Sequence, residues 1–382
     1  MSLTPEQIQI DALIEKHVSP LPDYVQEYIR AKKRAGHSPN TLLQYLYRYT
    51  HFFNWLVTES VVNSKDVAYI SLEHLEKLPK QQVEFYLEFL KEEELHFVND
   101  TKKKRGDSIV ILAISALKSL FNYLTKETEI EEGERKGECY FDRNVMSKIV
   151  IRTKKETANK RAKKISSVIL NENEIAKFLD FIANDYINTL PTNIMKQRFQ
   201  RDKERDLAIL SLMLGSGIRV SEASKLLVKK IRGKRLQIEV VRKGNEEDIV
   251  SVLESAMNDL QAYLHIRETR YPGSKNNPFC FVSVYGGSVR PLSRRAIQNL
   301  VNKYTAAFSD GEGIGPHKLR HSFSADFIRK GGHIILLMGQ LGHKSIETTS
   351  LYTNLAKSDS DIIMKKINKS RVEKRNNSSY SE

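Results

Sequence analysis

The C-terminal half of the chain carries side chains that together could break a phosphodiester bond without a metal ion. Tyr352 follows His343 by nine residues, His317 and Arg320 are three residues apart, and Arg219 follows a Gly-Ser-Gly break. A phenol can attack phosphorus, but its ordinary pKa of about 10 makes it a poor nucleophile until its surroundings favour the phenolate. Two guanidinium groups can bind the non-bridging oxygens as planar forks. The pattern therefore predicts a tyrosine nucleophile beside a phosphate clamp.

Each of these features is weak by itself. A His-x-x-Arg sequence occurs by chance in many helices, and a Gly-His pair often only ends a helix. A single arginine is more often a surface ion-pair residue, and a single tyrosine is more often part of a core. The joint occurrence of all of them, in this order, favours catalysis over coincidence.

Helices and turns must bring these side chains together. On a helix, His317 and Arg320 would share one face because they are three residues apart. Arg219 would begin a helix, where backbone N–H groups also favour anions. A helix after the Leu-Gly-His turn at His343 would carry Tyr352 to the same pocket.

The composition excludes several classes of protein and points to a polyanionic partner. Lysine and arginine exceed aspartate and glutamate by 61 − 47 = 14, an excess typical of proteins that bind nucleic acid. We find no apolar run of about 18 residues and no secretory signal, so no membrane span is expected. Cys139 and Cys280 form no metal-type spacing and fit a reducing cytosol. We therefore expect a cytoplasmic protein without a metal or another cofactor.

The length of 382 residues favours two domains. Residues 20–150 predict a helical bundle, with a start signal at Ser38-Pro39 and apolar residues recurring every three or four positions. One such stripe comprises Leu42, Leu46, Tyr49, Phe53 and Leu56.

The remainder divides into a linker, a second domain and a tail. Residues 151–167 are strongly basic without apolar periodicity and predict an interdomain linker. Residues 168–367 predict an α-rich domain that begins with a capping box at Asn171 and Glu174. Its small antiparallel sheet is predicted from the alternating segments 236–241 and 249–252. The polar residues 368–382 predict a disordered tail.

Two clusters of basic residues are candidates for contacts with a phosphate backbone. One is expected in a loop of the helical domain and the other in the linker. Such runs are often only solvated surface, but both lie beside predicted DNA-facing elements. Their members are Lys102, Lys103, Lys104, Arg105, Lys160, Arg161, Lys163 and Lys164.

Four sequence boxes resemble the catalytic domain of the tyrosine recombinases, the phage-integrase-like enzymes. They are residues 217–222 followed by Leu226, residues 317–321, residues 341–343, and Tyr352-Thr353. Segments 140–146, 154–157 and 203–209 narrow the resemblance to Xer-type chromosome dimer resolvases that work as a single recombinase. Leu112 departs from this pattern, since many relatives have arginine there.

The resemblance implies a role for each residue of the boxes. Tyr352 matches the nucleophile that becomes linked to the 3′ phosphate. Arg219 and Arg320 match the phosphate clamp, and Glu222 matches the acidic residue that supports the first arginine. His317 and His343 match the hydrogen-bonding and proton-handling positions, and Lys243, at the hairpin turn, matches the general acid for the leaving oxygen.

The resemblance also implies an architecture and partners. The fold would be mainly α, with a SAM-like core-binding helical bundle and an α-rich catalytic domain, arranged as a C-shaped clamp on double-stranded DNA. A homodimer would bind a palindromic site and a homotetramer would form the synaptic complex, with a DNA translocase as a candidate partner. The implied function is resolution of chromosome dimers at a terminus-proximal site during cell division.

The sequence also allows four other functions to be considered. His317 and His321 are four residues apart, as in a zinc-binding helix, but Lys318 stands where such a site has its acidic base. An accessory DNA-binding protein would have no use for the whole catalytic set. A type IB topoisomerase shares the chemistry, although the N-terminal domain favours recombination. An integrase or excisionase of a mobile element has identical chemistry and is the main alternative.

Overall fold

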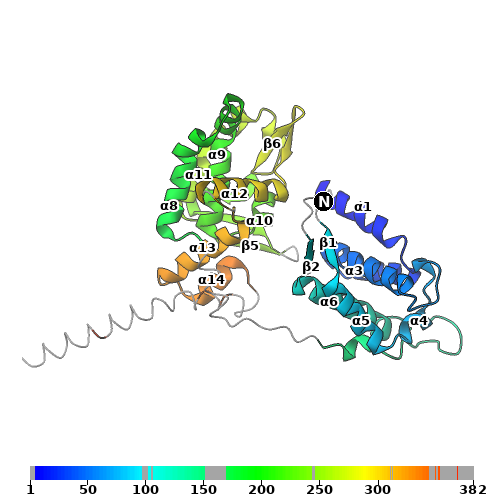
Figure 1. Cartoon of the computed structure of the whole chain (residues 1–382). Coiled ribbons are helices and arrows are strands. Elements are labelled where there is room, and N and C mark those ends of the chain that lie inside the picture. The colour runs from blue at the N-terminus through cyan, green and yellow to red at the C-terminus, as the bar shows by residue number, and fades with distance from the viewer. Residues whose placement is uncertain are drawn as a thin grey trace, which may run out of the picture. The chain divides into compact units, whose positions relative to one another are not determined.

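The computed structural model describes residues 5–96, 102–104, 106–150, 169–242, 246–309, 311, 313–343, 349, 352 and 368. It divides into two compact units, Met1–Lys155 and Glu156–Glu382, which are considered separately (Figure 1). The division falls inside the predicted linker, whose residues 151–167 lie outside the described residues. Both units are mainly helical with small antiparallel sheets, which confirms the predicted fold class.

The first unit is a helical bundle with an aromatic-rich core. Its elements are α1 (Pro5–Val18), α2 (Asp23–Arg34), α3 (Pro39–Thr58), α4 (Leu72–Glu76), α5 (Lys80–Glu92), β1 (Glu94–His96), β2 (Lys102–Lys104) and α6 (Asp107–Lys126). The predicted stripe on α3 is fully buried, and the Tyr49 hydroxyl donates to the Ala116 carbonyl of α6 at 2.8 Å. Ser38 occupies the N-cap position of α3, but its side chain accepts no capping hydrogen bond.

Two features of this unit differ from the sequence-based expectation. The basic run was expected in a loop, yet Lys102–Lys104 pairs with Glu94–His96 as a short antiparallel ladder. Main-chain pairing of two three-residue segments leaves no side-chain periodicity that a sequence could reveal. The second feature is α6, which among the described residues is the one helix long and apolar enough to span a membrane by length and composition.

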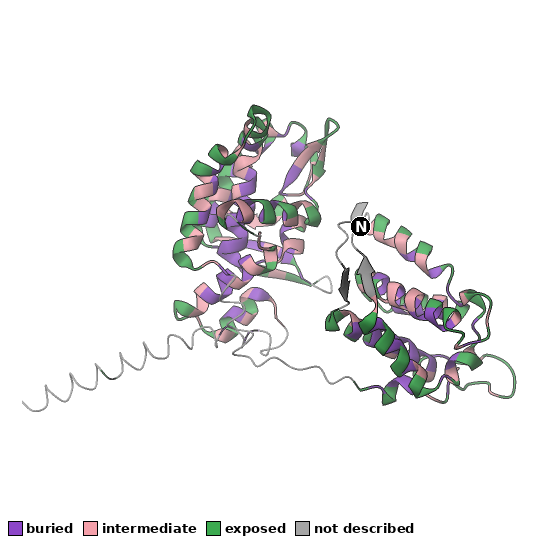
Figure 2. Ribbon diagram, viewed as in Figure 1, coloured by how far each residue is buried: buried purple, intermediate pink, exposed green. Residues whose placement is uncertain are grey.

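Helix α6 packs as a core helix of the unit. Its sequence is not an uninterrupted apolar run, because Lys118 lies within it. Half of its most apolar stretch is buried, including Val110, Leu117 and Leu120, which belong to the same core as the α3 stripe. Figure 2 shows the buried residues lining the inner sides of the helices of this unit.

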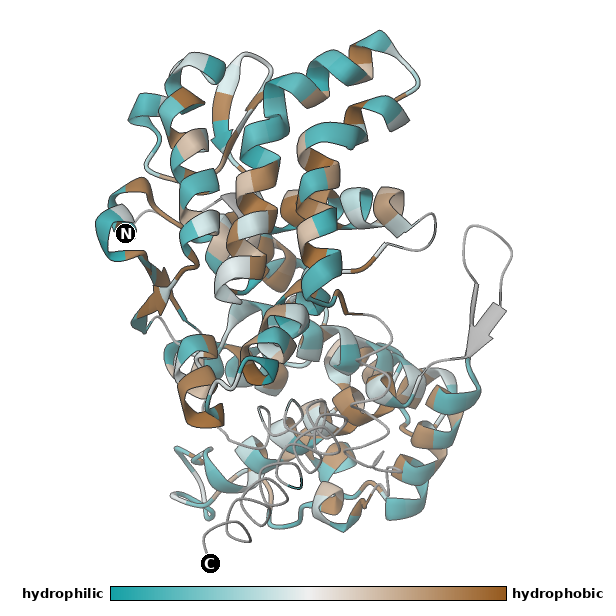
Figure 3. Cartoon of the chain, turned by 90° about the vertical axis from the view of Figure 1, so that its left-hand side faces the viewer, coloured by the Kyte–Doolittle hydropathy of each residue, from teal (hydrophilic) through white to brown (hydrophobic). Residues whose placement is uncertain are grey.

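The second unit spans all six predicted catalytic residues. Its helices are α8 (Glu172–Asp180), α9 (Asn193–Ser216), α10 (Val220–Lys225), α11 (Glu254–Arg270), α12 (Arg294–Ser309), α13 (Pro316–Arg329) and α14 (Ile334–Leu341). Its strands are β3 (Ile231–Arg232), β4 (Gln237–Val241), β5 (Glu247–Ser251), β6 (Val282–Tyr285) and β7 (Ser288–Pro291). Helices with mixed hydrophobic and hydrophilic faces surround a buried core (Figure 3).

Local signals in the sequence explain several of these elements. The capping box is confirmed: Asn171 Oδ1 accepts from the Glu174 backbone at 3.0 Å, and Glu174 Oε2 accepts from the Asn171 backbone at 2.7 Å. The predicted hairpin is also confirmed, with β3, β4 and β5 forming an antiparallel sheet in that order. The β6–β7 hairpin was not predicted, and it turns at Gly286 and Gly287, both with positive φ.

Candidate active site

A glycine at the end of α9 positions the first arginine. Gly217 ends the helix in the left-handed conformation, with φ 69°. A Cβ there would lie 2.4 Å from Phe323 of α13, so both the backbone angle and the close packing require glycine. The chain then turns into α10 with Arg219 at the N-cap. This turn brings Arg219 next to the helix that carries His317 and Arg320.

Glu222 fixes the guanidinium of Arg219. Its Oε2 accepts from the Arg219 backbone N–H at 2.8 Å, and its Oε1 accepts from Nη1 at 2.9 Å. The Glu222 side chain is only 2% exposed, whereas that of Arg219 is 35% exposed. In the described part of the chain, Arg219 Nε and Nη2 donate to no protein group. These outward N–H groups are suited to bind an anion.

Arg320 is the most deeply buried arginine of the site. Its residue is 1% exposed. Nη1 donates to the Gly217 carbonyl at 2.7 Å and Nη2 donates to the Leu341 carbonyl at 2.7 Å. Nε is buried and has no partner among the described residues. Because a buried N–H without an acceptor is costly, this atom is a natural donor for a ligand oxygen. Burial, followed by the nearby Arg219, lowers the pKa of Arg320 to about 10, so it remains charged at neutral pH.

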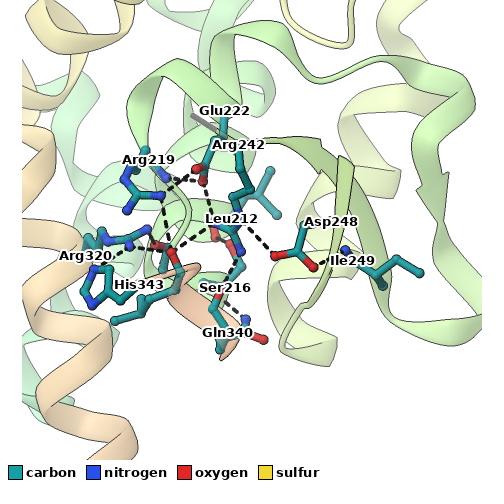
Figure 4. A network of polar contacts seen from close by, with 12 residues as sticks. Leu212, Ser216, Arg219, Glu222, Arg242, Asp248, Ile249, Arg320, Gln340 and His343 are labelled. Atoms are coloured by element: carbon teal, nitrogen blue, oxygen red, sulfur yellow. Dashed lines mark hydrogen bonds and ion pairs between the residues drawn. The ribbon is translucent and has the colours of Figure 1, made fainter. Parts of the chain in front are cut away.

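Arg242 is a third guanidinium of this region, buried like that of Arg320, and its role was not foreseen from the sequence. Nε donates to Asp248 at 3.0 Å, Nη1 to Glu222 Oε2 at 3.1 Å, and Nη2 to the Gln340 carbonyl at 2.8 Å. Its Nη1 also lies 3.2 Å from the Leu341 carbonyl. Arg242 therefore joins the β4–β5 hairpin to the start of α10 and the end of α14 (Figure 4).

The carbonyl of Leu341 is the acceptor that all three arginines share. Arg219 Nη1 donates to it at 3.3 Å, Arg242 Nη1 at 3.2 Å and Arg320 Nη2 at 2.7 Å. This oxygen lies in the last turn of α14, where unsatisfied carbonyls carry the negative end of the helix dipole. Figure 4 shows the side chains of Arg219, Arg242 and Arg320 within this network of polar contacts. The helix end thus gathers the cationic groups of the site.

The Leu-Gly-His turn has a direct structural reason for its glycine. Gly342 ends α14 with φ 62°, and a Cβ there would lie 2.6 Å from Arg242 Nε. His343 follows, with its Nε2 3.0 Å from Arg320 Nη2 and its Nδ1 2.9 Å from Thr349 Oγ1. Because an arginine can only donate, Nε2 must accept and Nδ1 carries the proton toward Thr349.

The electrostatic surroundings keep His343 neutral. Burial, then the positive charges of Arg320 and Arg219, lower its pKa to about 4. Above that pH the ring has the lone pair on Nε2 that the bond to Arg320 needs. His343 therefore orients Arg320 at neutral pH.

Tyr352 is buried close to α13. Its residue is 2% exposed and belongs to a small apolar cluster with Phe323, Leu337 and Leu341. Its hydroxyl lies 2.5 Å from Nδ1 of His321. Burial raises the pKa of Tyr352, although a hydrogen bond with Ser324 and the charge of Arg320 oppose that rise. The hydroxyl is therefore protonated at neutral pH.

The remaining predicted residues are placed as follows. His317 begins α13 with an exposed side chain, and its ring centroid lies 4.7 Å from that of His321. Lys243 lies outside the described residues, within a loop whose ends are joined by a hydrogen bond from the Arg242 N–H to the Glu246 carbonyl at 2.8 Å. Arg105 and the candidates at 160, 161, 163 and 164 also lie outside the described residues.

The structure thus brings five of the six predicted catalytic residues and Glu222 into one region of the second unit. Among the described residues, no group of three or more His, Cys, Asp or Glu side chains could hold a metal ion. Sequence reasoning missed Arg242 and the contact of His321 with Tyr352. In the sequence, His321 suggested only the second histidine of a zinc-binding helix, four residues after His317.

Comparison with known proteins agrees with this geometry. Residues 168–359 match the Phage integrase family. The chain is 38% identical over 344 residues to tyrosine recombinase XerS of Streptococcus thermophilus strain CNRZ 1066, covering 90% of this chain and 94% of the relative. It is 35% identical over 354 residues to XerS of Streptococcus gordonii, covering 93% and 98%. The chain belongs to the phage integrase family.

Within that family it is an enzyme that cleaves and rejoins DNA, and the predicted similarity to single-recombinase Xer proteins is confirmed. Solved structures share the fold. The XerH recombinase bound to its difH substrate matches with a TM-score of 0.56 at 18% identity, covering 85% of this chain and 78% of that one. A lambda integrase dimer bound to a core site matches with a TM-score of 0.51 at 13% identity, covering 86% and 94%.

Proposed function

We propose that this protein is a site-specific recombinase that resolves chromosome dimers and uses Tyr352 as its nucleophile. The observation that carries the proposal is the convergence of Arg219 and Arg320 on the carbonyl of Leu341, a residue of the cluster that contains Tyr352. Each arginine has N–H groups that no described protein group uses. The similarity to XerS over 90% of the chain supports the Xer-type reaction.

The proposed chemistry is a transesterification. Arg219 Nε and Nη2, together with Arg320 Nε, bind the non-bridging oxygens of the scissile phosphate, where negative charge develops. Tyr352 attacks phosphorus, Lys243 protonates the leaving 5′ oxygen, and a 3′-phosphotyrosyl bond forms. A 5′ hydroxyl from the partner strand then displaces the tyrosine. Because the phosphotyrosyl bond keeps the energy of the phosphodiester, the cycle consumes no ATP and needs no metal or other cofactor.

The supporting residues have distinct roles in this proposal. Glu222 holds Arg219 in place, and neutral His343 orients Arg320 through Nε2. His317, exposed at the start of α13, is free to hydrogen-bond a phosphate oxygen. The N-terminal end of this helix adds backbone N–H groups that favour an anion.

The proposed partner is double-stranded DNA at a palindromic site. The two units, 20–150 and 168–367, would grip the duplex as a clamp, with a homodimer per site and a homotetramer at synapsis. The net charge of +14 supports extensive contact with phosphates, and the basic residues at 102–105 and 160–164 are the proposed contacts. A complex of XerH with difH and a lambda integrase dimer on its core site show related folds bound to DNA. The enzyme would act in the cytoplasm, with a DNA translocase as a candidate activator.

Covalent trapping tests this function. The full-length protein is incubated with sheared DNA from its own genome and denatured, and the attached DNA is sequenced. Attachment at one chromosomal palindrome near the replication terminus is the expected result, and attachment at the ends of an inserted element would identify a mobile-element integrase instead. Y352F should bind the same DNA without forming a covalent complex. Strand exchange by Y352F would refute the assignment of the nucleophile.

A further inference from the structure

The side chain of His321 makes a short polar contact with the hydroxyl of Tyr352. Its Nδ1 lies 2.5 Å from the Tyr352 hydroxyl, and the two rings are 5.6 Å apart at an interplanar angle of 51°. His321 follows Arg320 directly on α13, a helix of 14 residues. One rigid helix therefore carries both a clamp arginine and the group that contacts the nucleophile, which favours precise positioning.

The surroundings of His321 keep its ring neutral. The charged and titratable groups that act on it are His317, Lys318 and Arg320 on α13 and His343 beyond α14. Burial and these groups all disfavour a protonated imidazole, and they lower its pKa to about 4. Above that pH, with the ring proton on Nε2, the Nδ1 lone pair faces the phenolic O–H.

The other described groups of the site are less suited to accept the phenolic proton. His317 is exposed, and its described ring contact is with His321 rather than with Tyr352. Ser324 hydrogen-bonds to Tyr352, but a serine hydroxyl is too weak a base to take its proton. Glu222 already accepts hydrogen bonds from Arg219 and Arg242. Both nitrogens of His343 are engaged, with Arg320 and Thr349. An arginine has no acceptor atom.

We propose that His321 is the catalytic base that takes the proton of Tyr352 as the phenolic oxygen attacks phosphorus. This inference rests on the proposed role of Tyr352 as nucleophile. During cleavage, the tyrosine O–H bond breaks and its proton moves to Nδ1, while the O–P bond forms and the bond from phosphorus to the 5′ oxygen breaks. Lys243 supplies the proton that the leaving oxygen takes.

The reverse step restores every group. The incoming 5′ hydroxyl returns its proton to Lys243 as it attacks phosphorus, and the departing tyrosine recovers its proton from His321. No oxidant, reductant or added reactant enters the cycle. The tyrosine can thus remain protonated and buried until phosphorus is in reach, which spares it the cost of a buried phenolate.

H321N is a suitable variant because the asparagine amide can occupy the position of Nδ1. It can accept the hydrogen bond from Tyr352, but it cannot take the proton. Cleavage of a nicked DNA substrate that traps the covalent complex should fall about 100-fold or more, with DNA binding and thermal stability retained. H265N is the matched control, since His265 is exposed on α11, and it should cleave at the wild-type rate.

Replacement of Tyr352 by a fluorinated tyrosine separates proton transfer from positioning. A tyrosine fluorinated at several ring positions ionises at lower pH and depends less on a base, so it should bring the cleavage rate of H321N to within a few-fold of wild type. It should not restore K243A, which should instead be restored by a 5′-bridging phosphorothiolate, whose sulfur leaves without a proton.

Each other outcome has a clear meaning. Wild-type or faster cleavage by H321N would overturn the proposal and indicate that His321 only holds the tyrosine at rest. An equal defect with tyrosine and fluorotyrosine would also overturn it, because it would indicate a structural role. Cleavage by Y352F would instead refute the assignment of the nucleophile, so failure of the proposed function can be told apart from failure of this inference.

Discussion

Arg242 donates a hydrogen bond to Glu222 at 3.1 Å, and their side chains are 6% and 2% exposed. Glu222 therefore serves two guanidinium groups, because it also accepts from Arg219 at 2.9 Å. The β4–β5 hairpin is thereby joined to Arg219, the first arginine of the proposed phosphate clamp. Lys243, the proposed general acid, follows Arg242 directly in the sequence.

Removal of Arg242 should destabilise the protein and slow cleavage. R242A removes one donor each from Glu222, Asp248 and the carbonyls of Gln340 and Leu341, and loss of one partner of a buried ion pair typically costs about 3–5 kcal/mol. We expect a loss of about 3 kcal/mol in the free energy of unfolding, measured by urea denaturation. R235A removes an exposed arginine from the same unit and should change this value by about 0.5 kcal/mol or less. Equal stabilities of R242A and R235A would contradict the network.

Substitution by alanine should have opposite effects on stability at Gly342, which follows α14, and at Gly339, which lies within it. G342A places a Cβ 2.6 Å from Arg242 Nε at a positive φ, so it should lower stability by about 1 kcal/mol or more and reduce cleavage strongly. Nothing lies within 4 Å of a Cβ at Gly339 inside α14. G339A should therefore leave cleavage unchanged and stabilise the protein by about 0.5–1 kcal/mol. A harmless G342A would show that the turn does not constrain Arg242.

We expect that a lysine at position 320 cannot perform the function of Arg320 in cleavage. A lysine keeps the charge but cannot reach the Gly217 carbonyl, the Leu341 carbonyl and His343 while offering a further N–H to phosphate. R320K should slow cleavage on the order of a hundred- to a thousandfold, in a single-turnover assay, with much less effect on DNA binding. R329K alters an exposed arginine of the same helix and should cleave normally. A loss of less than about fivefold in R320K would argue against a planar clamp.

Stability should fall on mild acidification. His321 and His343 have pKa values lowered to about 4, first by burial and then by nearby positive groups, whereas an unfolded histidine titrates near 6.5. Between these values the unfolded chain binds protons that the folded chain does not, so the free energy of unfolding decreases as pH falls from about 6.5 to about 4. Below that window these two histidines contribute no further loss. Urea denaturation at several pH values measures the slope, which H343N should reduce, and an unchanged slope would contradict the lowered pKa.

Local signals allowed much of the second unit to be predicted. The Asn171 capping box and the β4–β5 hairpin follow from residues adjacent in sequence. The arginine and histidine positions came from a resemblance in short boxes, and the structure brings them together. The partnership of Arg242 with Leu341 could not be foreseen, because 99 residues separate the two groups and the acceptor is a main-chain atom. The contact of His321 with Tyr352 likewise depends on tertiary packing across 31 residues.

The shared Leu341 carbonyl also has a consequence for evolution. Three guanidinium groups meet there, and among the described residues Glu222 is the one fully buried carboxylate that contacts them, since Asp248 is 41% exposed. Arg320 is disfavoured in its charged form by both Arg219 and Arg242, so mutual repulsion opposes folding. The surplus positive charge that suits the region to a phosphodiester thus reduces thermodynamic stability. Substitutions that reduce this electrostatic repulsion should raise the free energy of unfolding and lower the rate of cleavage. This trade-off between stability and activity arises at the end of α14, a helix of only eight residues.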